Sequence, residues 1–126
     1  MARRNGGWKM AAAALLLALP FWGAAKAERV VACAGVENRE PSGAADRFAA
    51  AGEVWCFSEL SDAADTSSIT HVWLKDGREV FRQTLAVKAA HWRTWSRKRV
   101  SAGAWKVSVQ DPSGAEIGSV QFTVGP

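Results

Sequence analysis

Apolar and polar residues alternate in short runs along most of the chain, and residues typical of turns separate these runs. Alternation with a period of two places one side of a segment against a core and the other side in solvent, as in a β-strand. The runs predict seven short strands, at residues 29–36, 54–60, 69–75, 79–87, 91–98, 104–110 and 117–124.

An alanine-rich stretch at residues 43–51 breaks this alternation and predicts one short helix. Seven short strands with turn residues between them are typical of a β-sandwich. Residues 28–126 are therefore expected to form a single all-β domain, a small antiparallel β-sandwich of the immunoglobulin-like kind with about seven strands.

Two turn sequences predict how neighbouring strands pair. Asp76-Gly77 suits a two-residue type I′ turn, and Asp-Pro-Ser-Gly at residues 111–114 suits a three-residue loop. Counting outward from the second turn pairs Val107 with Ser119 and Val109 with Ile117, and it assigns Trp105 to the core. Counting outward from the first turn gives a core face of Val72, Leu74 and Phe81, and an opposite face of His71, Trp73, Val80 and Arg82.

The first 27 residues predict an export signal. A basic start precedes an almost unbroken apolar run at residues 10–21, and Ala25-Lys26-Ala27 has the small-x-small pattern of a cleavage site. The mature chain would begin at Glu28, and the protein is expected to be periplasmic or secreted.

Two alternatives to this cleavage are weighed. An uncleaved anchor needs about 20 apolar residues, and this run is shorter and contains Pro20, so no membrane span is expected after cleavage. Residues 30–33, Val-Val-Ala-Cys, resemble the box that precedes a lipidated cysteine, which leaves lipidation at Cys33 open. Lys26, Glu28 and Arg29 separate that box from the apolar run, and this favours the soluble form.

Removal of the signal changes the charge of the protein. The whole chain has a formal net charge of +4, but four of its 16 lysines and arginines precede Glu28, and the remaining 12 equal the 12 acidic residues. The basic, tryptophan-containing stretch 91–106 resembles a single-strand nucleic-acid surface. Export and a neutral mature chain argue against a nucleic-acid partner.

Cys33 and Cys56 are the two cysteines of the chain. In an oxidising compartment such a pair predicts a disulfide, which would stabilise a small domain by about 3 kcal/mol on the chain-entropy model. His71 and His91 lie on separate expected strands and do not complete a zinc set, and no calcium-binding or phosphate-binding loop is present. No metal and no cofactor are expected.

Residues 91–99, His-Trp-Arg-Thr-Trp-Ser-Arg-Lys-Arg, form the most unusual segment, because both faces of the expected strand mix polar or charged residues with tryptophan. With Cys33, Pro41 and Cys56, several motifs give the chain a resemblance to the bacterial family Domain of Unknown Function 2914. These motifs are His71-Val-Trp73, Arg93-Thr-Trp95-Ser-Arg-Lys98, Gly103-Ala-Trp105-Lys-Val107 and Asp111-Pro-Ser-Gly114. The resemblance implies an exported or membrane-tethered bacterial module, and it carries over no catalytic or binding residue.

The sequence favours a non-catalytic module that binds a glycan or a protein of the cell envelope. Tryptophan rings beside cationic donors suit sugar rings or an extended peptide, and arginine forks suit carboxylate or phosphate. The candidate binding residues are His71, Trp73, Arg82, Arg93, Trp95 and Lys98.

Two other functions stay open at this point. One is a small enzyme acting on envelope polymers, with His71 as general acid–base while Arg93 and Lys98 orient an anionic group. The other is a structural accessory domain whose tryptophans and arginines serve the fold, with Arg93 stacking on a tryptophan or pairing with Glu59 or Glu79.

Overall fold

The computed structural model describes residues 25–125, and within this range it contains ten strands and no helix. Each of the seven predicted strands is present, with shifted ends. The expectation of an all-β domain is thus confirmed, although the described residues form ten strands instead of about seven. The strands are β2 (Lys26–Cys33), β3 (Gly35–Glu37), β4 (Glu40–Ser42), β5 (Arg47–Phe48), β6 (Gly52–Ser61), β7 (Ser68–Lys75), β8 (Arg78–Ala86), β9 (Trp92–Val100), β10 (Gly103–Gln110) and β11 (Glu116–Val124).

The predicted helix at residues 43–51 is wrong. This segment consists of turns and bends around the two-residue strand β5, which pairs in parallel with β11. The Phe48 ring packs edge-to-face on Phe122, with ring centroids 5.5 Å apart. Pairing and packing with β11 therefore override the helix propensity of the alanines.

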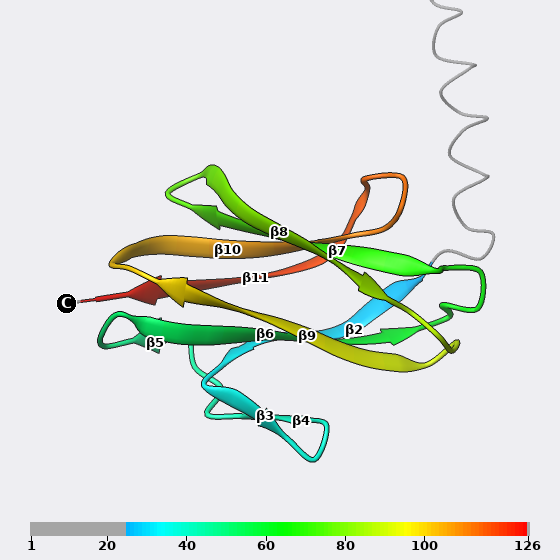
Figure 1. The fold of residues 1–126 in the computed structure, drawn as a ribbon, viewed down its shortest axis with the longest axis horizontal. Coiled ribbons are helices and arrows are strands. Elements are labelled where there is room, and N and C mark those ends of the chain that lie inside the picture. The colour runs from blue at the N-terminus through cyan, green and yellow to red at the C-terminus, as the bar shows by residue number, and fades with distance from the viewer. Residues whose placement is uncertain (1–24, 126) are drawn as a thin grey trace, which may run out of the picture.

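Two sheets face each other and enclose the core (Figure 1). The larger sheet has the order β5-β11-β10-β7-β8, and the smaller has the order β2-β6-β9. The β3–β4 hairpin stands off the smaller sheet on the side away from the larger sheet (Figure 1). Apart from the parallel β5–β11 pair, the neighbouring strands of all three sheets run antiparallel.

The centre of the core is aromatic. Trp73, Trp105 and Phe122 all come from the larger sheet, and their ring centroids lie 6.1–6.4 Å apart. The smaller sheet covers these rings with small and branched side chains, which are Ala32, Val54, Cys56 and Val100. Large rings opposite small side chains allow the two layers to pack without voids.

Both predicted turns are confirmed, but both predicted registers are wrong by one residue beyond the turn. Asp76 and Gly77 have positive φ angles of 50° and 85°, as a type I′ turn requires, and Lys75 pairs with Arg78. A β-bulge then shifts the register, so that Trp73 lies opposite Phe81 instead of Val80.

The β10–β11 hairpin behaves in the same way. Gly114 has a φ of 90° and closes the turn after Asp111, and a bulge follows directly after the first strand pair. Val107 consequently pairs with Val120 instead of Ser119. The assignment of Trp105 and Val107 to the core is confirmed, since both are buried.

The predicted faces of the β7–β8 hairpin are correct only in part. Val72 is buried, and Val80 and Arg82 are exposed, as predicted. His71 and Trp73 are both 0% exposed, whereas Phe81, which was assigned to the core, is 36% exposed. The cause is the pairing of β7 with β10, which places Trp73 beside Val107 on the inner side of the larger sheet. β8 is the edge strand of that sheet, and nearly all of its residues are exposed.

The predicted Cys33–Cys56 disulfide is wrong, because both cysteines are free and buried. Ala32 pairs with Cys56, and Cys33 pairs with Trp55. Since successive residues of a strand point to opposite faces, the two thiols lie on opposite sides of the smaller sheet. Burial raises the pKa of both thiols, which keeps them protonated and unreactive.

Truncation of Trp73 and of Phe81 tests which of these two side chains belongs to the core. We expect Trp73→Ala to lower the free energy of unfolding by about 3–5 kcal/mol, because it empties the aromatic centre of the core. Phe81→Ala should lower it by less than about 1 kcal/mol, as is usual for an exposed position. Urea denaturation of both variants measures the difference, and a larger loss for Phe81→Ala would contradict the structure.

Candidate functional site

His71 lies inside the protein, in a chain of hydrogen bonds between the two sheets. Its Nε2 lies 2.8 Å from the Ser58 hydroxyl oxygen, and its Nδ1 lies 2.6 Å from that of Ser96. Trp73 Nε1 donates to the same Ser96 oxygen over 3.1 Å. β7 supplies the two rings, and β6 and β9 each supply one serine. All four side chains are buried.

This geometry removes His71 and Trp73 from the predicted binding face. Burial lowers the pKa of His71 from 6.5 to about 4, so the imidazole is neutral at physiological pH. Both ring nitrogens are already bonded to serines, and no side of the ring meets solvent. His71 therefore has no route to a substrate, and the assignment of His71 as general acid–base is not supported.

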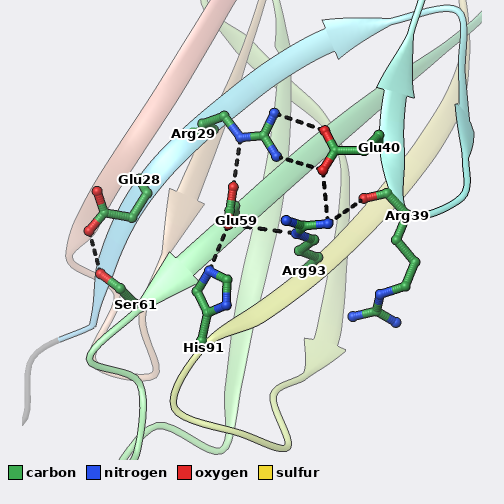
Figure 2. Close-up of polar contacts among 8 residues, drawn as sticks. All are labelled: Glu28, Arg29, Arg39, Glu40, Glu59, Ser61, His91 and Arg93. Atoms are coloured by element: carbon green, nitrogen blue, oxygen red, sulfur yellow. Dashed lines mark hydrogen bonds and ion pairs between the residues drawn. The ribbon is translucent and has the colours of Figure 1, made fainter.

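A cluster of charged side chains covers one end of the outer face of the smaller sheet (Figure 2). Glu59 lies at its centre and is only 14% exposed. One carboxylate oxygen accepts a hydrogen bond from Arg29 Nε over 2.6 Å, and the other lies 2.6 Å from His91 Nε2 and 3.6 Å from Arg93 Nε. Register explains the contacts, because Arg29, Glu59 and Arg93 lie side by side on β2, β6 and β9.

Glu40 extends the cluster to the β3–β4 hairpin (Figure 2). Its carboxylate lies between the two guanidinium groups, 3.2 Å from Arg29 and 2.8 Å from Arg93. Arg93 also donates to the main-chain oxygen of Arg39 over 3.3 Å. These bonds hold the hairpin onto the sheet. The pairing of Arg93 with Glu59, weighed above as a structural role for Arg93, is confirmed.

The arginines and glutamates of the cluster neutralise one another, and the cluster suits neither acid catalysis nor metal binding. The hydrogen bond from Arg29 holds the pKa of Glu59 below its usual range, so this carboxyl stays ionised and is no proton donor at neutral pH. Within residues 25–125, no three His, Cys, Asp or Glu side chains form a group that could hold a metal ion. Sequence reasoning missed His91, Arg29 and Glu40 here, because only the strand register reveals that they meet.

A ladder of aromatic rings continues from this cluster along the same outer face. Phe57 and Trp95 lie on paired positions of β6 and β9 and stack, with centroids 6.3 Å apart and planes 9° apart. Two residues further along, the Arg97 guanidinium lies 5.1 Å from the centre of the Trp55 ring. Arg93, Trp95 and Arg97 occupy alternate positions of β9 and therefore share this face.

A groove of about 340 Å³ opens between the edge strands β8 and β9. Trp55, Trp95, Ser96 and Arg97 form one side, and Gln83 of β8 forms the other. At the same edge, Lys98 Nζ lies 5.6 Å from the centre of the exposed Phe81 ring. We call this region the β8–β9 surface, defined by Trp55, Phe81, Gln83, Trp95, Arg97 and Lys98.

The β8–β9 surface brings together two of the six predicted binding residues, Trp95 and Lys98. Arg82 is exposed and paired with Glu79, and the register places it on the other face of β8 from Phe81 and Gln83. His71 and Trp73 lie in the core, and Arg93 belongs to the charged cluster. Another hollow, of about 420 Å³, lies near Asp46, Lys106 and Trp105, but that tryptophan is only 4% exposed and presents no ring to a ligand. Lys106 there is already paired with Glu116. The β8–β9 surface is therefore the better candidate.

The buried histidine generates a testable dependence of stability on pH. Because the folded pKa lies near 4 and the ordinary value is 6.5, the stabilising effect of neutral His71 is complete above pH 6.5 and is lost as the pH falls toward 4. Between pH 7 and pH 5 we expect a loss of about 2 kcal/mol from this group.

The measurement is urea denaturation at both pH values for the wild-type chain and for His71→Gln, whose amide can still bond both serines. The variant should lack this part of the pH dependence. Equal losses in both proteins would show that His71 does not titrate as its burial requires.

Comparison with known proteins agrees with the resemblance noted in the sequence. A sequence model of the family described as "Protein of unknown function (DUF2914)" matches residues 66–124, which hold strands β7 to β11. No curated protein matches the chain. No helix among the described residues is long and apolar enough to cross a membrane. Over its β7–β11 segment, the chain is similar to the DUF2914 family.

Proposed function

We propose that the chain is an exported, non-catalytic binding module of the bacterial cell envelope, and that the β8–β9 surface recognises an envelope glycan or protein. The observation that carries this proposal is the groove between β8 and β9, where Trp55 and Trp95 are half-buried beside Arg97. Partly exposed tryptophan rings next to guanidinium groups provide both stacking area and directed hydrogen-bond donors.

The chemistry of this groove favours binding over catalysis. The polar side chains on its walls are an arginine, a glutamine and the Ser96 hydroxyl, which is committed to His71 and Trp73. None of them is a carboxylate or an imidazole that could transfer a proton at neutral pH. Such a lining can hold and orient a ligand.

The position of the predicted cleavage site supports export of an intact domain. A bulge at Glu28 interrupts the pairing of β2 with β6, and regular pairing runs from Arg29 to Cys33. Cleavage after Ala27 would thus remove the two β2 residues that precede the bulge and the small side chain of Ala25 from one end of the core, and it would leave the regular part of β2 in place. Lipidation at Cys33 would instead require cleavage just before that residue and the loss of nearly all of β2, whose Ala32 belongs to the core.

Truncation of Trp95 tests the binding surface. We expect Trp95→Ala to weaken retention on purified peptidoglycan or envelope polysaccharide at least about tenfold, because tryptophans of this kind carry a large share of binding energy. Trp92→Ala is the matched control, since Trp92 is also half-buried on β9 but packs on the core side. Both are compared with wild type at a temperature where all three are folded. Equal retention of the two variants would count against the surface.

The export proposal predicts the mass of the mature protein. After expression in a bacterium, the chain recovered from the periplasm or the medium should begin at Glu28 and carry no acyl group. Intact-mass measurement reads both properties. A chain that keeps residues 1–27, or an acylated chain that begins at Cys33, would overturn this proposal.

A further inference from the structure

The two edge strands that border the groove carry an unusual excess of positive charge. β8 and β9 together contain six arginines and lysines and a single acid, Glu79. The chain after Ala27 is neutral as a whole, with 12 bases and 12 acids. The excess at these edges is therefore a local feature of the fold, and it is not a property of the composition.

Ion pairs neutralise only part of this excess. Arg93 is paired with Glu40 and Glu59, Arg82 with Glu79, and Arg97 more loosely with Glu53 at 3.6 Å. Among the described residues, the other three cations of the two strands have no carboxylate within 4 Å, and these are Arg78, Lys98 and Arg99. The lysine instead lies against the Phe81 ring. Such unpaired cations attract anions from solution.

The cations and the tryptophans share one regular row. Arg93, Trp95, Arg97 and Arg99 occupy alternate positions of β9, so their side chains leave the same face about 7 Å apart. The register of β9 with β6 is unbroken over its whole length, and it places Trp55 beside Arg97. A ligand that repeats a flat ring and a negative charge can engage several members of this row at once, and multivalent contact raises affinity.

The backbone of these edges is poorly suited to an added peptide strand. β8 lies beside β9, with Phe81 against Lys98 and Gln83 across the groove, so the free edge of β9 is partly occupied. β8 itself contains the bulge at Val80, and bulges at sheet edges hinder strand addition. A ligand at these edges would therefore meet side chains and not free backbone groups. Sugar polymers bind to proteins through such aromatic rings and charged groups.

We propose that the β8–β9 surface binds an anionic polysaccharide, with sugar rings stacked on Trp55 and Trp95 and carboxylates held by Arg97 and Arg99. This proposal rests on the proposed function and narrows it to one ligand chemistry. An arginine fork matches a carboxylate in a bidentate manner, and a tryptophan face accepts the apolar side of a sugar ring.

The test compares two forms of one polymer, polygalacturonate and its fully methyl-esterified, uncharged form. Affinity electrophoresis and calorimetry with the purified full domain should give at least about tenfold tighter binding to polygalacturonate. Raising the ionic strength from about 0.05 M to about 0.5 M should remove most of this preference, because salt screens exposed charges.

Two double variants separate local charge from overall charge. Arg97→Gln with Arg99→Gln should lower the affinity for polygalacturonate about tenfold or more and leave binding to the methyl ester within about twofold. Arg47→Gln with Lys88→Gln removes the same charge from exposed positions outside the surface, and it should change neither affinity by more than about twofold.

The outcomes distinguish this inference from the function on which it rests. Equal binding of the two polymers would overturn the anionic preference while leaving a glycan-binding surface. Poly-glutamate bound as tightly as polygalacturonate would replace the glycan with an acidic peptide. Absence of polygalacturonate binding at low ionic strength would overturn the inference, while retention on envelope material that depends on Trp95 would still support the proposed function.

Discussion

The chain of hydrogen bonds from Ser58 through His71 and Ser96 to Trp73 joins the two sheets, and the placement of the other strands depends on it. Buried polar groups destabilise a fold unless each finds a partner. Two serines from the smaller sheet and two rings from β7 can all be satisfied in only one relative position of the sheets. These directional hydrogen bonds thus fix the position of one sheet relative to the other, which the apolar contacts of the core would specify less strictly.

This inward orientation of β7 determines what the surface presents. Because Trp73 fills the aromatic centre with Trp105 and Phe122, β8 extends beyond the core and exposes nearly all of its residues. The edge of the larger sheet then lies beside the edge of the smaller one (Figure 1). The groove between β8 and β9 is a consequence of how the core is packed, so the β8–β9 surface and the core are coupled through a single strand.

The sequence predicts the strands and both turns, because alternation and turn chemistry are local properties of the chain. It does not predict the two bulges, which depend on how a whole strand settles against its neighbours, and one bulge moves every later pair by one residue. For a related reason, the sequence does not predict that His71 and Trp73 are buried. His71 is a polar residue, and its burial depends on hydrogen bonds to Ser58 and Ser96, which are distant along the chain.

The sequence singled out β9 as a strand rich in tryptophan and cations, but it could not separate cations that pair with acids from cations that have no acid partner. Arg93 and Arg97 lie on the same face of β9, four residues apart. The first meets Glu59 and Glu40, because β6 and the β3–β4 hairpin bring acids to that end of the sheet, whereas the second meets the Trp55 ring. Most of the acids lie in the first half of the chain, and the fold brings two of them, Glu40 and Glu59, to the hairpin end of the sheet. The cations at that end are therefore neutralised, whereas the β8–β9 edge keeps its positive charge.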